Sequence, residues 1–97
     1  MAIGVLFDFP GGTQEQYEAV CRDLNGGKTL SVLSEWPGPG IVAHIAGPTS
    51  DGWRVVDVWE SEETFQDFGA KLVPLLRKHR LPEVAPQIFR AHNVVRA

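Results

Sequence analysis

Apolar residues along this chain form strand-like runs that alternate with helical stripes. Residues 2–9 (AIGVLFDF) are almost wholly apolar and rich in Ile, Val and Phe, which is typical of a strand covered on both faces. Thr13 and Gln16 then form a capping-box pair, which predicts the start of a helix. The apolar stripe of this helix has members at i, i+3, i+4 and i+7: Tyr17, Val20, Cys21 and Leu24. Residues 25–27 (NGG) tolerate positive φ and predict its end.

A hairpin is predicted in the middle of the chain. Residues 41–46 and 53–59 are β-rich runs joined by a segment of Gly, Pro, Asp and Ser, which are turn-forming residues. The preceding residues 28–40 are long for a connection and carry Leu, Val and Trp, so we expect this segment to pack over the fold rather than to be freely solvated.

A second helix and a last strand are predicted in the C-terminal part. Ser61 is followed by two glutamates and then by an apolar face, which is typical of a capped helix start. Pro74 is expected to kink or divide this helix, because proline lacks an amide donor and crowds the preceding turn. Residues 87–95 are apolar enough for a final strand.

This order of elements predicts an α+β fold of the ferredoxin-like βαββαβ type, with an antiparallel sheet and both helices on one face. In the third predicted strand, Trp53, Val55 and Trp59 share one parity while Val56 and Val58 have the other, so both sides of the sheet need apolar cover. Helices can cover only one side. A second copy is the simplest cover for the other, and we therefore expect a homodimer with two facing sheets, a dimeric α/β barrel.

Composition narrows the possible functions. With 97 residues, the chain is expected to form a single domain over residues 1–97. A net charge of −3 without a basic cluster argues against nucleic acid as a partner. The N-terminal residues lack a cationic stretch followed by an apolar run, and no segment has the roughly 20 apolar residues needed to span a bilayer, so we expect no membrane association and a cytoplasmic location. Cys21 is the only cysteine and the three histidines are well separated, so no metal is expected.

The second half of the chain resembles a known group. Residues 47–48 and 52–63 (GWRVVDVWESEE), followed by Phe65 and Phe68, resemble the strand-to-helix signature of the antibiotic biosynthesis monooxygenase family of dimeric α/β-barrel proteins. The resemblance extends over nearly the whole chain and implies this fold. It specifies function poorly, because the superfamily also includes haem-degrading enzymes, cyclases, decarboxylases and members without a known activity.

The candidate catalytic pair is His44 and Asp57. If residues 49–52 form the hairpin turn, the two side chains lie opposite each other on one sheet face. A carboxylate fixes the tautomer of a neighbouring imidazole, which can then act as a general base toward a phenolic or carbon-bound proton. The alternative is a polar pair that only satisfies its own hydrogen bonds, in the core or at the dimer interface.

Further residues are candidates for a ligand pocket. Aromatic side chains suit an apolar pocket with polar tips that orient a flat molecule, although aromatics at these spacings are also common in cores. Trp59 is assigned to the core, whereas the pocket candidates are Trp36, Trp53, Tyr17 and Phe68. His92, in the predicted last strand, is expected near Asp8, a carboxylate that interrupts an apolar strand and needs either a partner or water.

Two classes of function follow. The resemblance implies a cofactor-independent monooxygenase, an oxidoreductase that deprotonates a hydroxylated aromatic or polyketide-like compound so that the anion reacts with dioxygen; no cofactor is expected. The other class is a non-catalytic homodimeric module that binds a small apolar or aromatic molecule. A weaker third alternative is a haem-degrading enzyme, for which Asp8 and Phe68 stand where that group has Asn and Trp, and His79 approximates its iron ligand.

Overall fold

The computed structural model describes residues 1–96 and contains a four-stranded antiparallel sheet with two α-helices. The elements follow the order β1 (Ile3–Pro10), α1 (Gln14–Leu24), β2 (Ile41–Thr49), β3 (Gly52–Trp59), α2 (Glu62–Lys78) and β4 (Gln87–Arg90), with a short 3-10 helix η1 (Leu33–Glu35) before β2. The strand order β2-β3-β1-β4 and the βαββαβ chain order together confirm the predicted ferredoxin-like α+β fold.

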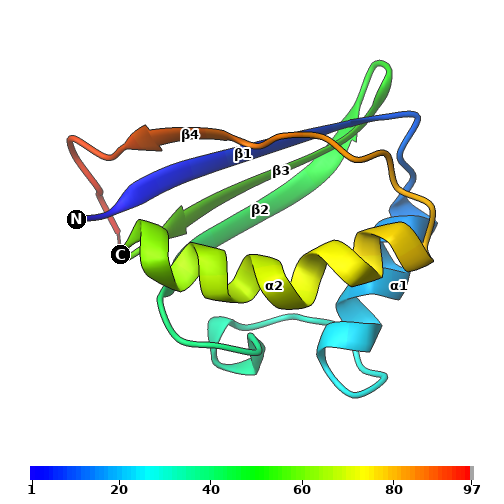
Figure 1. The fold of residues 1–97 in the computed structure, drawn as a ribbon, viewed down its shortest axis with the longest axis horizontal. Helices are drawn as coiled ribbons and strands as arrows, with labels where there is room; N and C mark the ends of the chain where they lie inside the picture. The colour runs from blue at the N-terminus through cyan, green and yellow to red at the C-terminus, as the bar shows by residue number, and fades with distance from the viewer. Residues whose placement is uncertain (97) are drawn as a thin grey trace.

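Both helices and the segment containing η1 lie on one side of the sheet, and the other side is bare (Figure 1). Alternation along β3 places Trp53, Val55 and Trp59 in the buried core beneath the helices. Val56 and Val58 point to the bare side and are half-buried. The prediction that this strand is apolar on both sides is therefore confirmed, and one chain covers only one of the two faces.

Side chains on the bare side form rows across the strands. One row contains Leu6, Val56 and Ile45, and Ile45 is 67% exposed. Val58 belongs to the next row, where Phe89 of β4 lies over Gly4 and is 60% exposed.

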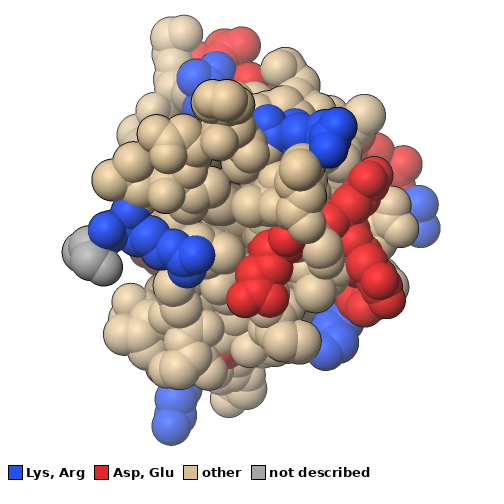
Figure 2. All heavy atoms as spheres, turned by 90° about the vertical axis from the view of Figure 1, so that its left-hand side faces the viewer, with Lys and Arg blue, Asp and Glu red and all other residues tan. Residues whose placement is uncertain are grey.

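Figure 2 shows a different face of the molecule, the left-hand side of Figure 1. On this face, basic side chains stand in separate groups amid uncharged surface, and acidic side chains gather beside them.

The first helix begins where the sequence predicts. Thr13 is its N-cap, and its hydroxyl accepts a hydrogen bond from the backbone N–H of Gln16 while the Gln16 side chain accepts one from the backbone N–H of Thr13. Asn25 caps its C-terminus, and Gly26 and Gly27 follow with φ of 61° and 95°. These local signals orient the Tyr17-to-Leu24 stripe toward the sheet.

The second helix runs unbroken through Pro74, so the expected division of this helix is wrong. Pro74 and Ala70 are both exposed. The carbonyl of Ala70, which loses its i+4 donor, can therefore bond to water, and packing of Phe65, Phe68, Leu72 and Leu76 into the core stabilises the turns on either side. Tertiary packing thus overrides the local effect of proline.

The last strand is shorter than predicted. β4 ends at Arg90 rather than Val95, because it runs antiparallel to β1 and reaches the first residue of that strand there: Ile3 pairs with Arg90. Beyond this point the backbone N–H of Ala91 donates to the carbonyl of Ala2, and β1 has no further partner to offer. His92 and Asn93 consequently lie outside the sheet and are exposed.

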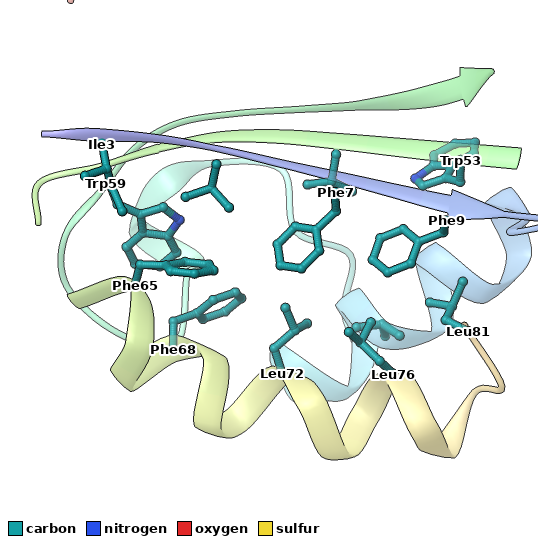
Figure 3. Close-up of a cluster of buried hydrophobic side chains, with 13 residues drawn as sticks. Ile3, Phe7, Phe9, Trp53, Trp59, Phe65, Phe68, Leu72, Leu76 and Leu81 are labelled. Atoms are coloured by element: carbon teal, nitrogen blue, oxygen red, sulfur yellow. The ribbon is translucent and has the colours of Figure 1, made fainter. Parts of the chain in front are cut away.

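The core fills the layer between the sheet and the helices (Figure 3). It consists of large apolar side chains from β1, β3 and both helices, and Trp59 and Val5 are fully buried. Cys21 is also buried, as its position in the stripe predicts. Residues 28–40 pack against the core through Trp36, but Val32 and Leu33 are exposed, so only part of this segment behaves as predicted. Over residues 1–96, neither helix is long and apolar enough to cross a membrane.

Candidate active site

The hairpin places His44 and Asp57 together. Thr49 pairs with Gly52 around a two-residue turn, and this register sets His44 opposite Asp57. Both side chains point to the helix side, where His44 Nδ1 lies 2.6 Å from Asp57 Oδ1. The Asp57 residue is 3% exposed and the His44 side chain 15%. The predicted cross-strand pair is confirmed as a contact.

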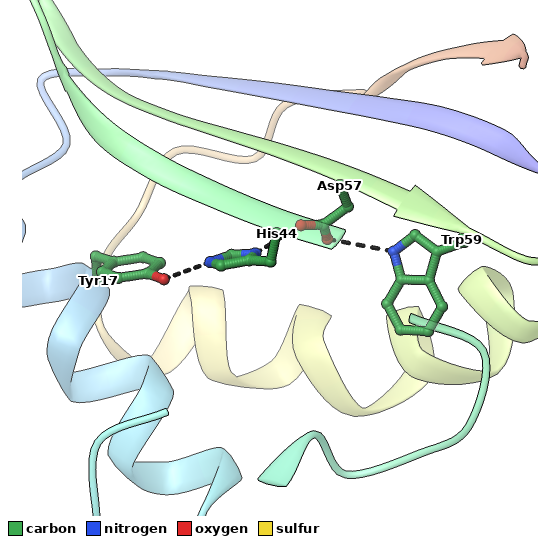
Figure 4. A network of polar contacts seen from close by, with 4 residues as sticks. All are labelled: Tyr17, His44, Asp57 and Trp59. Atoms are coloured by element: carbon green, nitrogen blue, oxygen red, sulfur yellow. Dashed lines mark hydrogen bonds and ion pairs between the residues drawn. The ribbon is translucent and has the colours of Figure 1, made fainter. Parts of the chain in front are cut away.

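Two aromatic residues extend this pair into a chain of hydrogen bonds (Figure 4). Tyr17 of α1 lies with its Oη 2.5 Å from His44 Nε2. At the other end, the indole N–H of Trp59 donates to Asp57 Oδ2 at 3.2 Å. Four residues from one helix and two strands thus form a continuous line from Tyr17 to Trp59.

The chemistry of the partners determines which atom donates and which accepts in each of these hydrogen bonds. The Trp59 indole can only donate, and a carboxylate can only accept, so His44 donates its Nδ1–H to Asp57. In the neutral imidazole Nε2 is then the acceptor, and the Tyr17 hydroxyl donates to it. Burial raises the pKa of Tyr17 well above its ordinary value, so this residue is a neutral phenol. The arrangement has the order of a catalytic triad, with a phenol at its outer end.

A small cavity adjoins this hydrogen-bonded network beneath the sheet. Its volume is about 50 Å³. The wall includes all four aromatic residues that the sequence suggests for a pocket, together with the catalytic candidates: Tyr17, Trp36, Trp53, Phe68, His44 and Asp57. The remaining wall is mostly apolar and comes from β1, β3, both helices, Leu30 and Leu81. The fold therefore brings together residues that the sequence could only propose singly.

A larger open groove lies on the other side of Trp36. It has a volume of about 670 Å³ and is bounded by residues 30–33, Trp36 and residues 42–44. Leu30, Trp36 and His44 line both the groove and the small cavity, and the Trp36 ring lies 4.6 Å from the His44 ring, centroid to centroid. These three residues, with Trp36 the largest, are thus the wall that the two spaces share.

Two indole N–H groups beside the cavity have no hydrogen-bond partner. The Nε1 atoms of Trp36 and Trp53 are both buried and unpaired. An unpaired buried donor costs about 1–3 kcal/mol, because it loses its bond to water and gains none. In its position over His44, Trp36 therefore carries the free-energy cost of an unpaired N–H, and this cost would be relieved if the side chain moved into solvent.

Two of the predicted site residues lie elsewhere. Asp8 points to the bare side of the sheet, where Arg54 binds it through two contacts of 2.6 and 3.0 Å and lowers its pKa. His92 lies beyond β4, at the opposite end of β1 from Asp8, because the two strands are antiparallel. The expected proximity of His92 and Asp8 is therefore wrong, and neither residue lines the cavity.

The haem alternative receives no support from His79. This residue lies 2.7 Å from Asp23 Oδ2 through its Nε2 atom, in a contact that joins the ends of the two helices. It does not line the cavity, whose volume is also far below what a macrocycle needs. Among residues 1–96, no group of three or more His, Cys, Asp or Glu side chains could hold a metal ion.

Sequence reasoning misses the polar roles of Tyr17 and Trp59. The sequence assigns Trp59 to the core and Tyr17 to the apolar stripe and the candidate pocket, and the structure half-buries Tyr17 and places it in the cavity wall. Which strand residue its hydroxyl reaches depends on how α1 lies across β2. For Trp59, the available signal is its position two residues after Asp57, because i and i+2 share one face of a strand.

The fold defines a class of small ferredoxin-like α+β proteins with a cavity between the sheet and its two helices. Two solved structures of SnoaB, a cofactor-independent oxygenase from Streptomyces nogalater, share this fold. One of them, a mutant form, matches with a TM-score of 0.60 at 16% identity over 97% of this chain and 95% of that chain. The other structure has a TM-score of 0.56 at 16% identity, over 97% of this chain and 93% of that chain.

These matches confirm the resemblance stated from the sequence as a resemblance of fold. No protein-family model matches the chain. No curated protein matches it by sequence.

Proposed function

We propose that this chain is a cofactor-independent oxygenase acting on a hydroxylated aromatic or polyketide-like compound, with His44 as its base. One observation carries the proposal: a hydrogen-bonded chain from Tyr17 through His44 to the buried Asp57, at the wall of an apolar cavity. The shared fold with SnoaB, a cofactor-independent oxygenase, supports the reaction class.

The proton path follows from the network. Asp57 holds the Nδ1 proton of His44, so the lone pair on Nε2 is the basic site. Tyr17 occupies that lone pair, and a phenol can accept one hydrogen bond while it donates another. A substrate hydroxyl that donates to Tyr17 Oη can pass its proton through Tyr17 to Nε2 in one concerted step. Burial disfavours the Tyr17 phenolate, which is why the transfer is concerted.

The oxidation balances with dioxygen as the only oxidant. The electron-rich anion left by deprotonation transfers electrons to dioxygen, and a C–O bond forms at a ring carbon that carries hydrogen. His44 returns the first proton to the distal peroxide oxygen, the carbon gives up its own proton as the O–O bond breaks, and the departing hydroxide takes up that second proton. The substrate gains one oxygen and loses two hydrogens, and the second oxygen atom leaves as water.

The organic substrate is proposed to bind in the open groove and to replace Trp36 over His44. The cavity of about 50 Å³ is too small for an aromatic ring, since a cavity known to bind benzene has a volume of about 150 Å³. The groove of about 670 Å³ falls in the usual range for small-molecule sites. Movement of Trp36 would join the two spaces and bring Tyr17 Oη within reach of a bound ring.

The test compares two histidines that each pair with an aspartate. Purified His44→Gln and His79→Gln variants are incubated with a panel of anthrones and naphthols under air, with oxygen uptake and product mass as readouts. We expect His44→Gln to lower kcat about 10²–10⁴-fold, as loss of a general base does, and His79→Gln to retain wild-type turnover. Unchanged turnover in His44→Gln would remove His44 from the mechanism.

A second candidate, a non-catalytic binding module, is favoured by the fact that both ring nitrogens of His44 already have partners inside the chain. In that case His44 and Asp57 only satisfy each other. Saturable binding of the same compounds, measured by quenching of tryptophan fluorescence, without oxygen uptake in the wild type would select this candidate over the oxygenase.

We also propose that two copies of this chain pair through the bare side of the sheet. That side exposes Ile45 and Phe89 beside the half-buried Leu6, Val56 and Val58. Its charged pair, Asp8 with Arg54, is mutually neutralised, so an identical surface can approach without net repulsion. A flat apolar surface of this kind suits isologous pairing of two sheets.

Sedimentation equilibrium at micromolar concentration tests the dimer. We expect a dimer for the wild type and a monomer for Ile45→Glu, which places a charge in the middle of the proposed interface. Val73→Glu is the matched control, because Val73 is 43% exposed on α2, on the helix side of the sheet. A monomeric wild type, or an Ile45→Glu variant that remains dimeric, would refute this pairing.

A further inference from the structure

We propose that the small cavity beneath the sheet is a binding site for dioxygen, next to the groove that receives the organic substrate and sharing the Trp36 wall with it. Its role as a store of the oxidant rests on the proposed oxygenase function, whereas the binding itself does not. The proposal stands on the size of the cavity, the chemistry of its wall and its position beside Tyr17 and His44.

The size and the wall select an apolar diatomic molecule. A volume of about 50 Å³ excludes an aromatic ring but accommodates dioxygen. The wall is apolar over most of its area, and Leu24, Leu72 and Leu76 are among the residues that form it. A stable buried water needs two to four polar partners, and apolar cavities without them stay dry and bind apolar gases.

The polar atoms near the cavity offer a water little to bind. The Tyr17 hydroxyl donates to His44, and both carboxylate oxygens of Asp57 already accept hydrogen bonds. The unpaired indole nitrogens of Trp36 and Trp53 are inaccessible to a water-sized molecule. Dioxygen requires no hydrogen bond, so this wall favours it over water.

The position of the cavity suits the reaction. Tyr17 and His44 line it, and the substrate anion proposed above would form beside these two residues. Cys21 also lines the cavity, and burial raises the pKa of its thiol. The protonated thiol reacts slowly with oxidants, so this wall residue is compatible with resident dioxygen.

Dioxygen itself is the first probe. It is paramagnetic, and under pressure it broadens the NMR signals of methyl groups that it contacts. We expect relaxation of the Val20 and Leu72 methyl groups, which line the cavity, to increase at least threefold more than that of Ile3, which is equally buried but outside it. Equal effects at all three residues would overturn the proposal.

Xenon is the second probe and gives the location. Crystals under xenon pressure are expected to show one anomalous peak inside the cavity, which Val20→Leu should reduce at least severalfold by filling the space. Val5→Leu adds the same carbon to a buried valine outside the cavity and should leave the peak unchanged. An ordered water in the cavity with no xenon peak would refute the site, and this result does not require either variant to fold.

Measurements of turnover distinguish a failure of the dioxygen site from a failure of the proposed oxygenase function. If both hold, Val20→Leu raises KM for dioxygen severalfold and leaves kcat at saturating oxygen unchanged. Xenon and dioxygen binding without any oxidation of the substrate panel would remove the oxygenase while the gas site stands. Oxidation with a KM for dioxygen that Val20→Leu does not alter would remove the site from the reaction while the oxygenase stands.

Discussion

Replacing Asp57 with Asn is the most informative single change, because it alters the proton positions in the whole hydrogen-bonded network from Tyr17 to Trp59 without altering the shape of the side chain. Asp57 accepts from His44 through one oxygen and from Trp59 through the other. An amide has one acceptor and one donor, and Trp59 can only donate. The Asn oxygen will therefore face Trp59, and its NH₂ group will face His44.

This reversal changes the tautomer of His44. Nδ1 must accept from the new NH₂ group, so the ring proton moves to Nε2. Nε2 then faces Tyr17 as a donor and has no lone pair for a substrate proton. In serine proteases, the equivalent exchange lowers kcat roughly 10⁴-fold for the same reason. We expect a loss of similar size in any turnover that depends on His44.

The stability cost can be worked from the contacts. A hydrogen bond that involves a charged group contributes about 1.5–3 kcal/mol, and the Asn variant replaces it with a neutral one worth about 1 kcal/mol. With Asp57 only 3% exposed, water cannot compensate. The difference is about 0.5–2 kcal/mol for each of the two bonds that Asp57 accepts, so a net loss of about 1–4 kcal/mol is expected, which lowers Tm by roughly 4–32 °C in a domain of this size.

The assay is long-range ¹H–¹⁵N NMR of the His44 ring, which distinguishes a protonated from an unprotonated nitrogen without a substrate. The wild type should show Nδ1–H and Asp57→Asn should show Nε2–H. Asp8→Asn is the control: it removes a carboxylate that pairs with Arg54 on the bare side of the sheet, away from the network, and it should leave the His44 ring unchanged. A wild-type ring that already carries its proton on Nε2, or a tautomer that Asp57→Asn does not alter, would refute the reasoning.

Three further predictions follow from the backbone and the surface. Gly52→Ala should destabilise the protein by about 1–3 kcal/mol in urea unfolding, because an added Cβ would lie 2.0 Å from the carbonyl oxygen of Phe9, whereas Gly47→Ala meets open space and should cost much less. Pro74→Ala should stabilise α2 by about 1–3 kcal/mol in the same assay, since it restores a helical N–H at an exposed position. Asp23→Asn should lower the stability at neutral pH and weaken its dependence on pH in the acid range: contacts with His79 and Lys78 hold the pKa of Asp23 below its ordinary value, so the wild type is stabilised above that value and loses this stabilisation as the pH falls through the folded-state pKa.

Each of these has a result that would contradict it. Equal losses in the Gly52 and Gly47 variants would mean that the close backbone approach is relieved without cost. A less stable Pro74→Ala variant would assign Pro74 a packing role that the structure does not show. Identical acid transitions for the wild type and Asp23→Asn, followed by circular dichroism, would mean that the contacts between Asp23 and α2 do not depend on its charge.

Local rules succeed where neighbouring residues alone determine the outcome. Thr13 and Gln16 define the start of α1 because both partners of the capping box lie within one turn. The contact between His44 and Asp57 is predictable because a short hairpin turn sets the register of both strands. Pro74 shows the limit of such rules, since the core contacts of α2 outweigh the loss of one helical hydrogen bond.

The order of elements, their faces and the His44–Asp57 pair are contained in the amino-acid sequence, because periodicity, caps and turns act over a few residues. Tertiary structure decided everything that depends on how separate elements meet. The packing of α1 over β2 brought Tyr17 to His44, and the end of β1 excluded His92 from the sheet. The small cavity likewise results from how the side chains of two layers pack together, and no local pattern specifies the space that they leave empty.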